Sequence, residues 1–424
     1  MRHFPLRSAA CFIGVSLLAA VGCRAPSPAT EPAARQWYRA NVATEEGQEF
    51  PFFLELPANC NTDTATIANG DERIPVPCQR FGGHLLLDFP VYGMRISAEA
   101  AKGGDLEGRW ERTGGARRKE RLRFGANPLA ALDARRRFAS GPANEGATGP
   151  PRDVSGIWRM QLDAYGLAKG VFEQEASGVV RGTIEVPSDY GDLRFLAGNL
   201  HGGELRVSTF DGGHAYALRG RLEADGSMEG EFVSSDGVRD TFSAKRSEDF
   251  DAVDPLQQVR VTSRAKRLDF APLRGPRYEG KAVILEIFGS WCPNCNDLAP
   301  LLTALYREHH QGGLEMLGVA YEVSDDEAYT RDRLTAYRAK HGVDWEVMLA
   351  ANPLDELFAA GPARLSPIEG VPLTIFLNRD RTIHAIYAGF RGPATGAAHQ
   401  ETTATFRRLT KEILESPRAD RRGG

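Results

Sequence analysis

The sequence is poor in cysteine, in net charge and in long apolar runs. Its 424 residues include six cysteines, and 52 Lys and Arg against 56 Asp and Glu give a net charge of −4. A nucleic-acid-binding face would need an excess of Lys and Arg, which this balance does not provide. The apolar run at residues 11–21 is too short to span a bilayer. A globular chain of this length exceeds one average core, so we expect about two or three domains.

The apolar run at residues 11–21 has the length of a signal-peptide core. It follows a positively charged start formed by Arg2, His3 and Arg7. It ends at Ala20-Val21-Gly22-Cys23, which is similar to the lipobox of bacterial lipoproteins, and a Pro-, Ala- and Ser-rich stretch follows. We therefore predict a lipoprotein-type signal peptide at 1–22, lipidation of Cys23, a tether at 23–36, and an exported periplasmic or cell-envelope lipoprotein. The alternative is an ordinary secretory signal that contains a cysteine.

The remaining cysteines fall into two local pairs. If Cys11 leaves with the signal and Cys23 takes the lipid, Cys60 with Cys78 and Cys292 with Cys295 are left. An even number in local pairs is typical of an oxidising compartment. A structural Cys60–Cys78 disulfide would close a short loop and contribute ~3 kcal/mol. The alternative is two unpaired buried thiols.

The N-terminal half has the pattern of short strands separated by turns. Apolar or alternating segments occur at residues 52–56, 83–89, 178–186, 204–208 and 215–220. Asp211-Gly212-Gly213 and Asp225-Gly226 supply turns of the hairpin type. These features predict an all-β antiparallel N-terminal region.

This region also contains a repeat. Residues 81–89 are followed by Leu106-Glu107-Gly108-Arg109-Trp110, and residues 200–208 are followed at a similar interval by Met228-Glu229-Gly230-Glu231-Phe232. The repeat indicates two related β-modules; the alternative is that both stretches merely obey the same hairpin rules. We place the first module at 37–139, including a basic surface stretch, and the second at 153–250. A Gly-, Pro- and Ala-rich linker at 140–152 joins them.

The sequence pattern changes in the last part of the chain, from short strands and turns to strands that alternate with helices. Residues 283–288 form a near-continuous apolar run, typical of a strand buried on both faces of a sheet. Leucines at helical spacing follow in residues 293–310. Further strands are expected at 314–320, 345–349, 374–377 and 383–388, and further helices at 325–341, 354–359 and 399–414. The alternation predicts an α/β domain at 255–424, with a central mixed sheet and flanking helices.

The motif Trp291-Cys292-Pro293-Asn294-Cys295 stands where this buried strand gives way to a helix. The helix N-terminus favours the thiolate of Cys292 and makes it the attacking sulfur. Pro293 suits the first helical turn, because its missing N–H would be unpaired there. Cys295, almost one turn further on, can resolve a mixed disulfide. A zinc site would need a second pair of ligands, which the domain does not offer at ligand spacing.

From Glu286 to Cys295, together with Gly370-Val371-Pro372, the sequence resembles the TlpA-like family of thioredoxin-fold protein disulfide reductases. The resemblance runs from about residue 261 to the C-terminus. It implies a cis peptide before Pro372, and a backbone at Val371 that pairs with an extended substrate segment.

The resemblance also implies that Glu286 is a buried acid beneath the resolving cysteine, where it would take the proton from Cys295. The alternative for Glu286 is a strand-edge carboxylate paired with Lys281. Trp291 is expected to cover the motif and contact substrate, or else to be a core aromatic residue. Leu373 stands where most family members have Thr, which alters the details of the substrate groove.

These features predict a thiol–disulfide oxidoreductase that reduces protein disulfides outside the cytoplasm, with Cys292 as nucleophile. The redox-active Cys292–Cys295 pair serves in place of a cofactor, and we expect no metal and no nucleic acid. The expected partners are a disulfide-containing protein, a membrane electron donor of the thiol-reducing type, and the membrane through the N-terminal lipid. The alternative is a surface lipoprotein whose β region captures a partner, with the redox domain auxiliary. Copper delivery is less favoured, because it usually needs a wider cysteine spacing.

Overall fold

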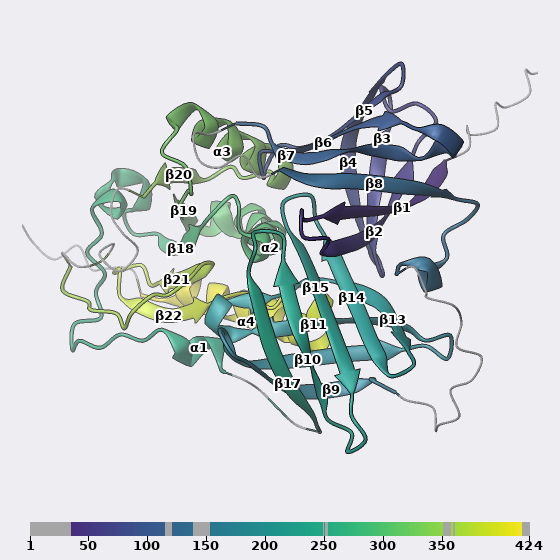
Figure 1. Cartoon of the computed structure of the whole chain (residues 1–424). Helices are drawn as coiled ribbons and strands as arrows, with labels where there is room; N and C mark the ends of the chain where they lie inside the picture. Colours follow the sequence, from purple (N-terminus) through teal and green to yellow (C-terminus); the bar gives the residue numbers. More distant parts are fainter. Residues whose placement is uncertain are drawn as a thin grey trace, which may run out of the picture. The chain divides into compact units, whose positions relative to one another are not determined.

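The computed structural model describes residues 35–114, 121–138, 153–248, 250, 253–350, 358 and 361–417 (Figure 1). The predicted signal peptide, Cys23, most of the tether and the 140–152 linker lie outside these residues. Among the helices of the described part, none is long and apolar enough to cross a membrane.

The first β-module closes on itself (purple to blue in Figure 1). Its strands are β1 (Gln36–Ala43), β2 (Glu49–Leu56), β3 (Thr64–Asn69), β4 (Glu72–Phe81), β5 (His84–Phe89), β6 (Met94–Ala100), β7 (Leu106–Arg112) and β8 (Arg121–Leu129). Each pairs antiparallel with the next, and β8 returns to β1. Alternate side chains such as Phe52, Leu54 and Ile96 fill the interior. We call this module the first barrel.

The second β-module is closed in the same way, because β10 pairs with both β9 and β11. Its strands are β9 (Gly156–Leu162), β10 (Gly166–Gln174), β11 (Val179–Val186), β12 (Gly191–Asp192), β13 (Leu196–His201), β14 (Glu204–Phe210), β15 (Ala215–Leu222), β16 (Met228–Ser234) and β17 (Arg239–Ser247). The two-residue β12 is attached to β11. Trp158, Met160 and Phe172 are among the buried core residues. We call this module the second barrel.

The sequence repeat falls at equivalent places in the two barrels. With β12 set aside, the Gly-Gly turns join the fourth strand to the fifth, at φ 60° for Gly82 and 58° for Gly202. The Glu-Gly-x-aromatic segments both lie on the seventh strand. A Cβ on Gly108 or on Gly230 would collide with a backbone carbonyl of the sixth strand. The antiparallel pairing expected from the sequence is therefore confirmed. The closure of each module into a barrel was not predicted.

The barrels share part of their cores. Phe210 at the end of β14 stacks on Phe52 of the first barrel, with ring centroids 4.3 Å apart. Arg137, which is buried, donates to Asn69 Oδ1 at 2.9 Å in the first barrel and to the Ser208 carbonyl at 2.9 Å in the second. The two β-modules therefore form one packed body.

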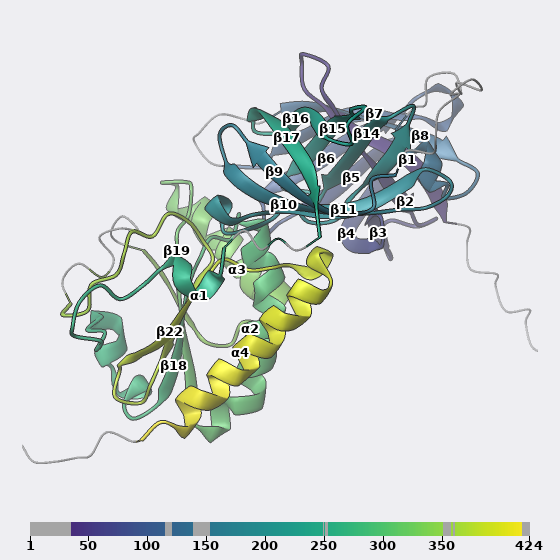
Figure 2. The same ribbon diagram turned by 90° about the horizontal axis from the view of Figure 1, so that it is seen from below.

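The C-terminal domain contains the expected mixed sheet, in the order β20-β19-β18-β21-β22. Its strands are β18 (Ala282–Phe288), β19 (Leu314–Ala320), β20 (Glu346–Leu349), β21 (Leu373–Leu377) and β22 (Ile383–Ala388), and its helices are α1 (Pro255–Gln258), α2 (Pro293–His309), α3 (Glu327–His341) and α4 (Ala397–Glu415). Strands β20, β19 and β18 pair parallel to one another, whereas β21 pairs antiparallel with both β18 and β22. Helices α2 and α4 cover the same face of the sheet (Figure 2). This is the thioredoxin-like arrangement expected from the sequence; the helix expected at 354–359 falls largely outside the described residues.

Candidate active site

Cys292 and Cys295 are joined as a disulfide at the start of α2, with their Cα atoms 5.2 Å apart. Cys292 is the N-cap residue, and its Sγ accepts a hydrogen bond from the backbone N–H of Cys295 at 3.1 Å. Pro293 occupies the first turn, as the motif predicts. Cys292 is 4% exposed and Cys295 is fully buried. An N–H group of this helix start is therefore aimed at the sulfur that is expected to attack.

The Val371–Pro372 peptide bond is cis, as the resemblance implied. The loop that carries it lies against the cysteines: the Val371 carbonyl oxygen is 3.7 Å from Cys292 Sγ. Pro372 is buried, and its carbonyl accepts from the backbone N–H of Gly389 at 2.8 Å. The structure thus brings the two halves of the predicted site together, although 79 residues separate Cys292 from Val371.

Glu286 is not on a sheet edge. It lies in the middle of β18, opposite Gly318 on one side and Thr374 on the other, and it is 2% exposed. It shares its face of β18 with Phe288, which belongs to the same core cluster as Cys292 and Cys295. Within the described residues, neither carboxylate oxygen has a hydrogen-bond partner. Pairing with Lys281 is therefore wrong, because burial in a central strand removes Glu286 from the edge.

Burial raises the pKa of Glu286 from 4.5 to about 8. The folded protein thus binds this proton more tightly than the unfolded chain, and stability should fall as pH rises from 4.5 to 8. We expect Glu286→Gln to gain stability relative to the unmodified protein over this window, by about 1.4 kcal/mol per pH unit at most, with no further gain above pH 8. Urea unfolding at several pH values measures this difference. The matched control is Glu279→Gln, on an exposed carboxylate; equal pH profiles for the two variants would contradict the assignment.

Trp291 is half-buried and has a fixed orientation. Its indole N–H donates to the Tyr321 carbonyl at 2.7 Å. Ser290, just before it, donates through its backbone N–H and its hydroxyl to Glu322, at 2.9 and 2.8 Å. These bonds hold the residues that lead into the motif, so that the Trp291 ring both packs on the core of the C-terminal domain and lines the cavity described below.

The second barrel contacts the cysteine motif through the segment from Tyr190 to Arg194. The backbone N–H of Asp192 donates to the Asn294 side chain at 3.3 Å, between the two cysteines in sequence. The Tyr190 hydroxyl accepts from the N–H of Glu369, which lies two residues before Val371, at 3.2 Å. Tyr190 and Arg194 adopt positive φ values, which are uncommon for residues with side chains. This segment therefore touches both the helix start and the cis-proline loop.

Arg194 is the centre of a buried group of charges. Its guanidinium bonds Asp297 of α2 at 2.7 Å and Glu72 of the first barrel, and it lies 3.9 Å from Asp211 of the second barrel. Burial disfavours the charged arginine, but Asp297, Glu72 and Asp211 together raise its pKa well above the usual range. One side chain thus connects all three parts of the described chain, and its partner Asp297 lies two residues beyond Cys295.

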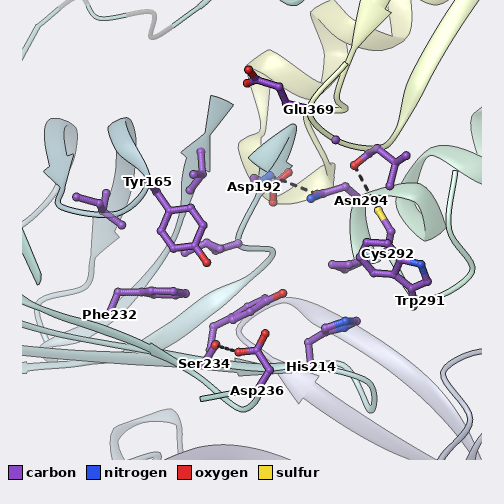
Figure 3. Close-up of a pocket in the computed structure, with 17 residues that line it drawn as sticks. Tyr165, Asp192, His214, Phe232, Ser234, Asp236, Trp291, Cys292, Asn294 and Glu369 are labelled. Atoms are coloured by element: carbon purple, nitrogen blue, oxygen red, sulfur yellow. Dashed lines mark hydrogen bonds between the residues drawn. The ribbon is translucent and has the colours of Figure 1, made fainter. Parts of the chain in front are cut away.

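A cavity of about 310 Å³ opens beside the cysteine pair. Figure 3 shows Cys292 and Trp291 on one side of it and Tyr165 and Phe232 of the second barrel on the other. Asp192, which is buried, also lines it, and burial followed by the nearby Asp297 raises the Asp192 pKa to about 7. A substrate sulfur that reaches Cys292 by this route would pass between the two domains.

The other predicted cysteine pair lies in the first barrel. Cys60 and Cys78 are both buried and are present as free thiols. The Cys78 thiol lies 3.6 Å from the Cys60 carbonyl oxygen. Burial and the neighbouring Cys60 raise the pKa of Cys78 to about 12, so this thiol is a poor nucleophile. The structural Cys60–Cys78 disulfide stays a prediction.

Several residues at this site were not predicted from the sequence. Asn294 lies within the motif but was given no role, and Asp192, Arg194 and Asp297 were not considered. The segment 389–393 also reaches the second barrel: Gly392 N–H donates to Asp192 Oδ2 at 2.6 Å. The polar Asn294 between the two cysteines could have indicated a contact with another segment, because a side-chain amide that becomes buried needs a hydrogen-bond partner.

Comparisons with known proteins find similarity among solved structures only. No family model matches the chain, and no curated protein matches it. A thioredoxin-family thiol:disulfide interchange protein from Chlorobium tepidum is 20% identical, over 39% of this chain and 99% of its own, with a TM-score of 0.25. A secreted disulfide oxidoreductase from Mycobacterium tuberculosis is 17% identical over 30% and 84%, with a TM-score of 0.22. A thiol-disulfide oxidoreductase from Bacteroides fragilis is 19% identical over 30% and 86%, with a TM-score of 0.23. Similarity at this level leaves the chemistry to be inferred from the site itself.

Proposed function

We propose that the chain is a thiol–disulfide oxidoreductase that reduces protein disulfides outside the cytoplasm. The observation that carries this proposal is the Cys292–Cys295 disulfide at a helix N-terminus, beside the Val371 carbonyl and facing a cavity. A structural disulfide would have no need of a cavity at its sulfur. The cysteine pair is itself the redox group in this proposal, with no further cofactor.

In the reduced protein, the Cys292 thiolate attacks one sulfur of the substrate disulfide. The backbone N–H of Cys295 and the helix dipole stabilise this thiolate. An extended substrate segment pairs with the backbone at Val371, next to the attacked sulfur. The substrate–substrate S–S bond breaks, a Cys292–substrate bond forms, and the other substrate sulfur leaves as a thiolate.

Cys295 then attacks Cys292 Sγ and releases the second substrate thiol. Its thiol must lose a proton first, and Glu286 is the proton acceptor in this proposal, because a carboxylate with a pKa of about 8 is close to the working pH. The Tyr337 hydroxyl donates to the Cys295 carbonyl at 3.3 Å, and burial followed by the Glu286 charge raises the Tyr337 pKa. Tyr337 therefore lies close both to Glu286 and to the turn of α2 that carries Cys295.

The proposal also includes export of the protein and reduction of its Cys292–Cys295 disulfide after each reaction. The sequence at residues 1–36, with Cys23 as lipid acceptor, favours an exported, membrane-attached protein. A membrane electron donor of the thiol-reducing type would then return the pair to the dithiol. The direction of transfer depends on tens of millivolts. A reduction potential well above about −150 mV, measured against glutathione, would overturn the reductase direction.

The proposal is tested by trapping. In a Cys295→Ser variant, Cys292 can still attack a substrate, but no thiol follows to resolve the mixed disulfide. We expect the variant to accumulate covalent complexes that resist denaturation and disappear on treatment with excess dithiothreitol. The Cys292→Ser/Cys295→Ser double variant is the control and should yield none. Complexes of equal abundance in both variants would show attachment through another residue and would contradict the assignment of Cys292.

A further inference from the structure

The wall of the cavity that faces Cys292 is built from aromatic rings of the second barrel. Tyr165 and Tyr216 flank Phe232, with ring centroids 6.1 and 5.9 Å from it, and His214 stacks on Tyr216 at 6.1 Å. All four residues line the cavity. Trp291 adds an aromatic ring from the opposite side (Figure 3). A group that enters the cavity therefore meets several aromatic rings, and the face of such a ring attracts a cation whereas its edge does not.

Two exposed carboxylates, Asp236 and Glu369, line the cavity. The buried Asp192 lines it as well, but its pKa of about 7 leaves it partly protonated near neutral pH. Ser234 donates its hydroxyl to Asp236, which fixes that carboxylate beside the aromatic wall (Figure 3). Among the described residues that line the cavity, none is Lys or Arg. Carboxylates combined with aromatic faces favour a positively charged occupant over a neutral or acidic one.

The remaining lining suits a side chain with an apolar stem. Leu162, Leu193 and Val371 also line the cavity and contribute apolar surface to it. Lys and Arg have such a shape, because their methylene chains pack on apolar surface while the charged end reaches polar groups. A volume of about 310 Å³ is at the small end for ligand pockets and admits a side chain, but no folded segment.

We propose that this cavity is a specificity subsite for a basic side chain of the substrate, adjacent in sequence to the half-cystine that Cys292 attacks. The substrate class is thus a protein disulfide with Lys or Arg beside one of its cysteines. The proposal rests on the oxidoreductase function proposed above. It adds a role for the second barrel, which supplies the aromatic wall and Asp236, while the C-terminal domain supplies the sulfur chemistry.

The test uses the reduced full chain and four short peptides. Each carries one cysteine as a mixed disulfide with thionitrobenzoate, and the residue next to it is Arg, Lys, norleucine or Glu. The two protein thiols provide two electrons: the S–S bond of the mixed disulfide breaks, the Cys292–Cys295 bond forms, and peptide thiol and coloured thionitrobenzoate are released. We expect the second-order rate constant of this single turnover for the Arg and Lys peptides to exceed that for norleucine by roughly tenfold, and the Glu peptide to be slowest.

Variants then locate the preference. In Asp236→Asn and in Tyr216→Leu, the ratio of the Arg to the norleucine rate should fall towards one. Glu229→Gln removes the same charge from exposed surface on β16, outside the lining residues, and should keep the ratio. Equal rates for all four peptides, a faster norleucine peptide, or a ratio unchanged in both cavity variants would each overturn the subsite. Failure to reduce any of the peptides would instead overturn the oxidoreductase function.

Discussion

A Cys292→Ser substitution should abolish disulfide reduction, with a residual rate at least about a thousandfold below that of the unmodified protein. A serine hydroxyl does not ionise at neutral pH and forms no mixed disulfide. The remaining motif thiol cannot substitute for it, because Cys295, in the first turn of α2, is fully buried. The measurement is the rate of thionitrobenzoate release from the peptide disulfides by each prereduced protein.

The chain contains its own control for this result. Cys60→Ser/Cys78→Ser removes two thiols from the first barrel, where the Cys78 pKa of about 12 keeps that sulfur protonated. This variant should reduce the peptides at a rate close to that of the unmodified protein. A large residual activity in Cys292→Ser would contradict the assigned nucleophile. Capture of a physiological partner that survives the Cys292→Ser change would favour the binding-module alternative for the β region.

The placement of the cysteine motif could be predicted from the sequence because its determinants are local. A buried strand, a turn and a helix start place Cys292, Pro293 and Cys295 within a few residues of each other, and each residue type has one physical reason to stand there. The cis peptide before Pro372 and the burial of Glu286 were added by resemblance to a family. These inferences required no knowledge of how distant segments pack.

The β region was predicted less completely, because strand pairing is set by long-range contacts. Alternation and turns predict antiparallel neighbours. Closure requires that β8 return to β1, and that β10 pair with β11 as well as with β9; no local pattern specifies either pairing. The Glu-Gly-x-aromatic repeat came nearest to this result, since Gly108 and Gly230 mark the same close approach between neighbouring strands.

The contacts between the β region and the motif could not be predicted at all. Asp192 and Asn294 are 102 residues apart, and Arg194 and Asp297 are 103 residues apart. Each is an ordinary polar residue in its own segment, and its partner is defined only once the domains are packed. The function of the second barrel therefore has to be inferred from the structure. We propose that its aromatic wall opposite Cys292 binds a basic side chain of the substrate.

Replacing Arg194 with Met should destabilise the protein by about 3–5 kcal/mol, because it leaves buried carboxylates without their cation. Asp211 is buried, Asp297 is half-buried, and Arg194 itself is 7% exposed. The measurement is the free energy of unfolding in urea. Arg206→Met is the matched control: its pair with Glu204 is solvent-exposed, so a loss within about 0.5 kcal/mol is expected. Equal losses for the two variants would show that the buried group of charges does not stabilise the packing of the domains.

Arg194→Met should also change the pH dependence of the reaction at Cys292. A second variant separates this effect from the loss of stability. With Arg194 gone, Asp297 is a less compensated charge in the helix that carries Cys292, and a nearby negative charge raises the pKa of a thiol. The midpoint of the pH–rate profile for thionitrobenzoate release should therefore move upward in Arg194→Met. In Arg194→Met/Asp297→Asn that charge is absent, so the midpoint should return and part of the lost stability should be recovered, by about 0.5–3 kcal/mol. A midpoint that stays in place in Arg194→Met would mean that Arg194 acts on packing alone, and that the cysteine pair is electrostatically independent of the barrels.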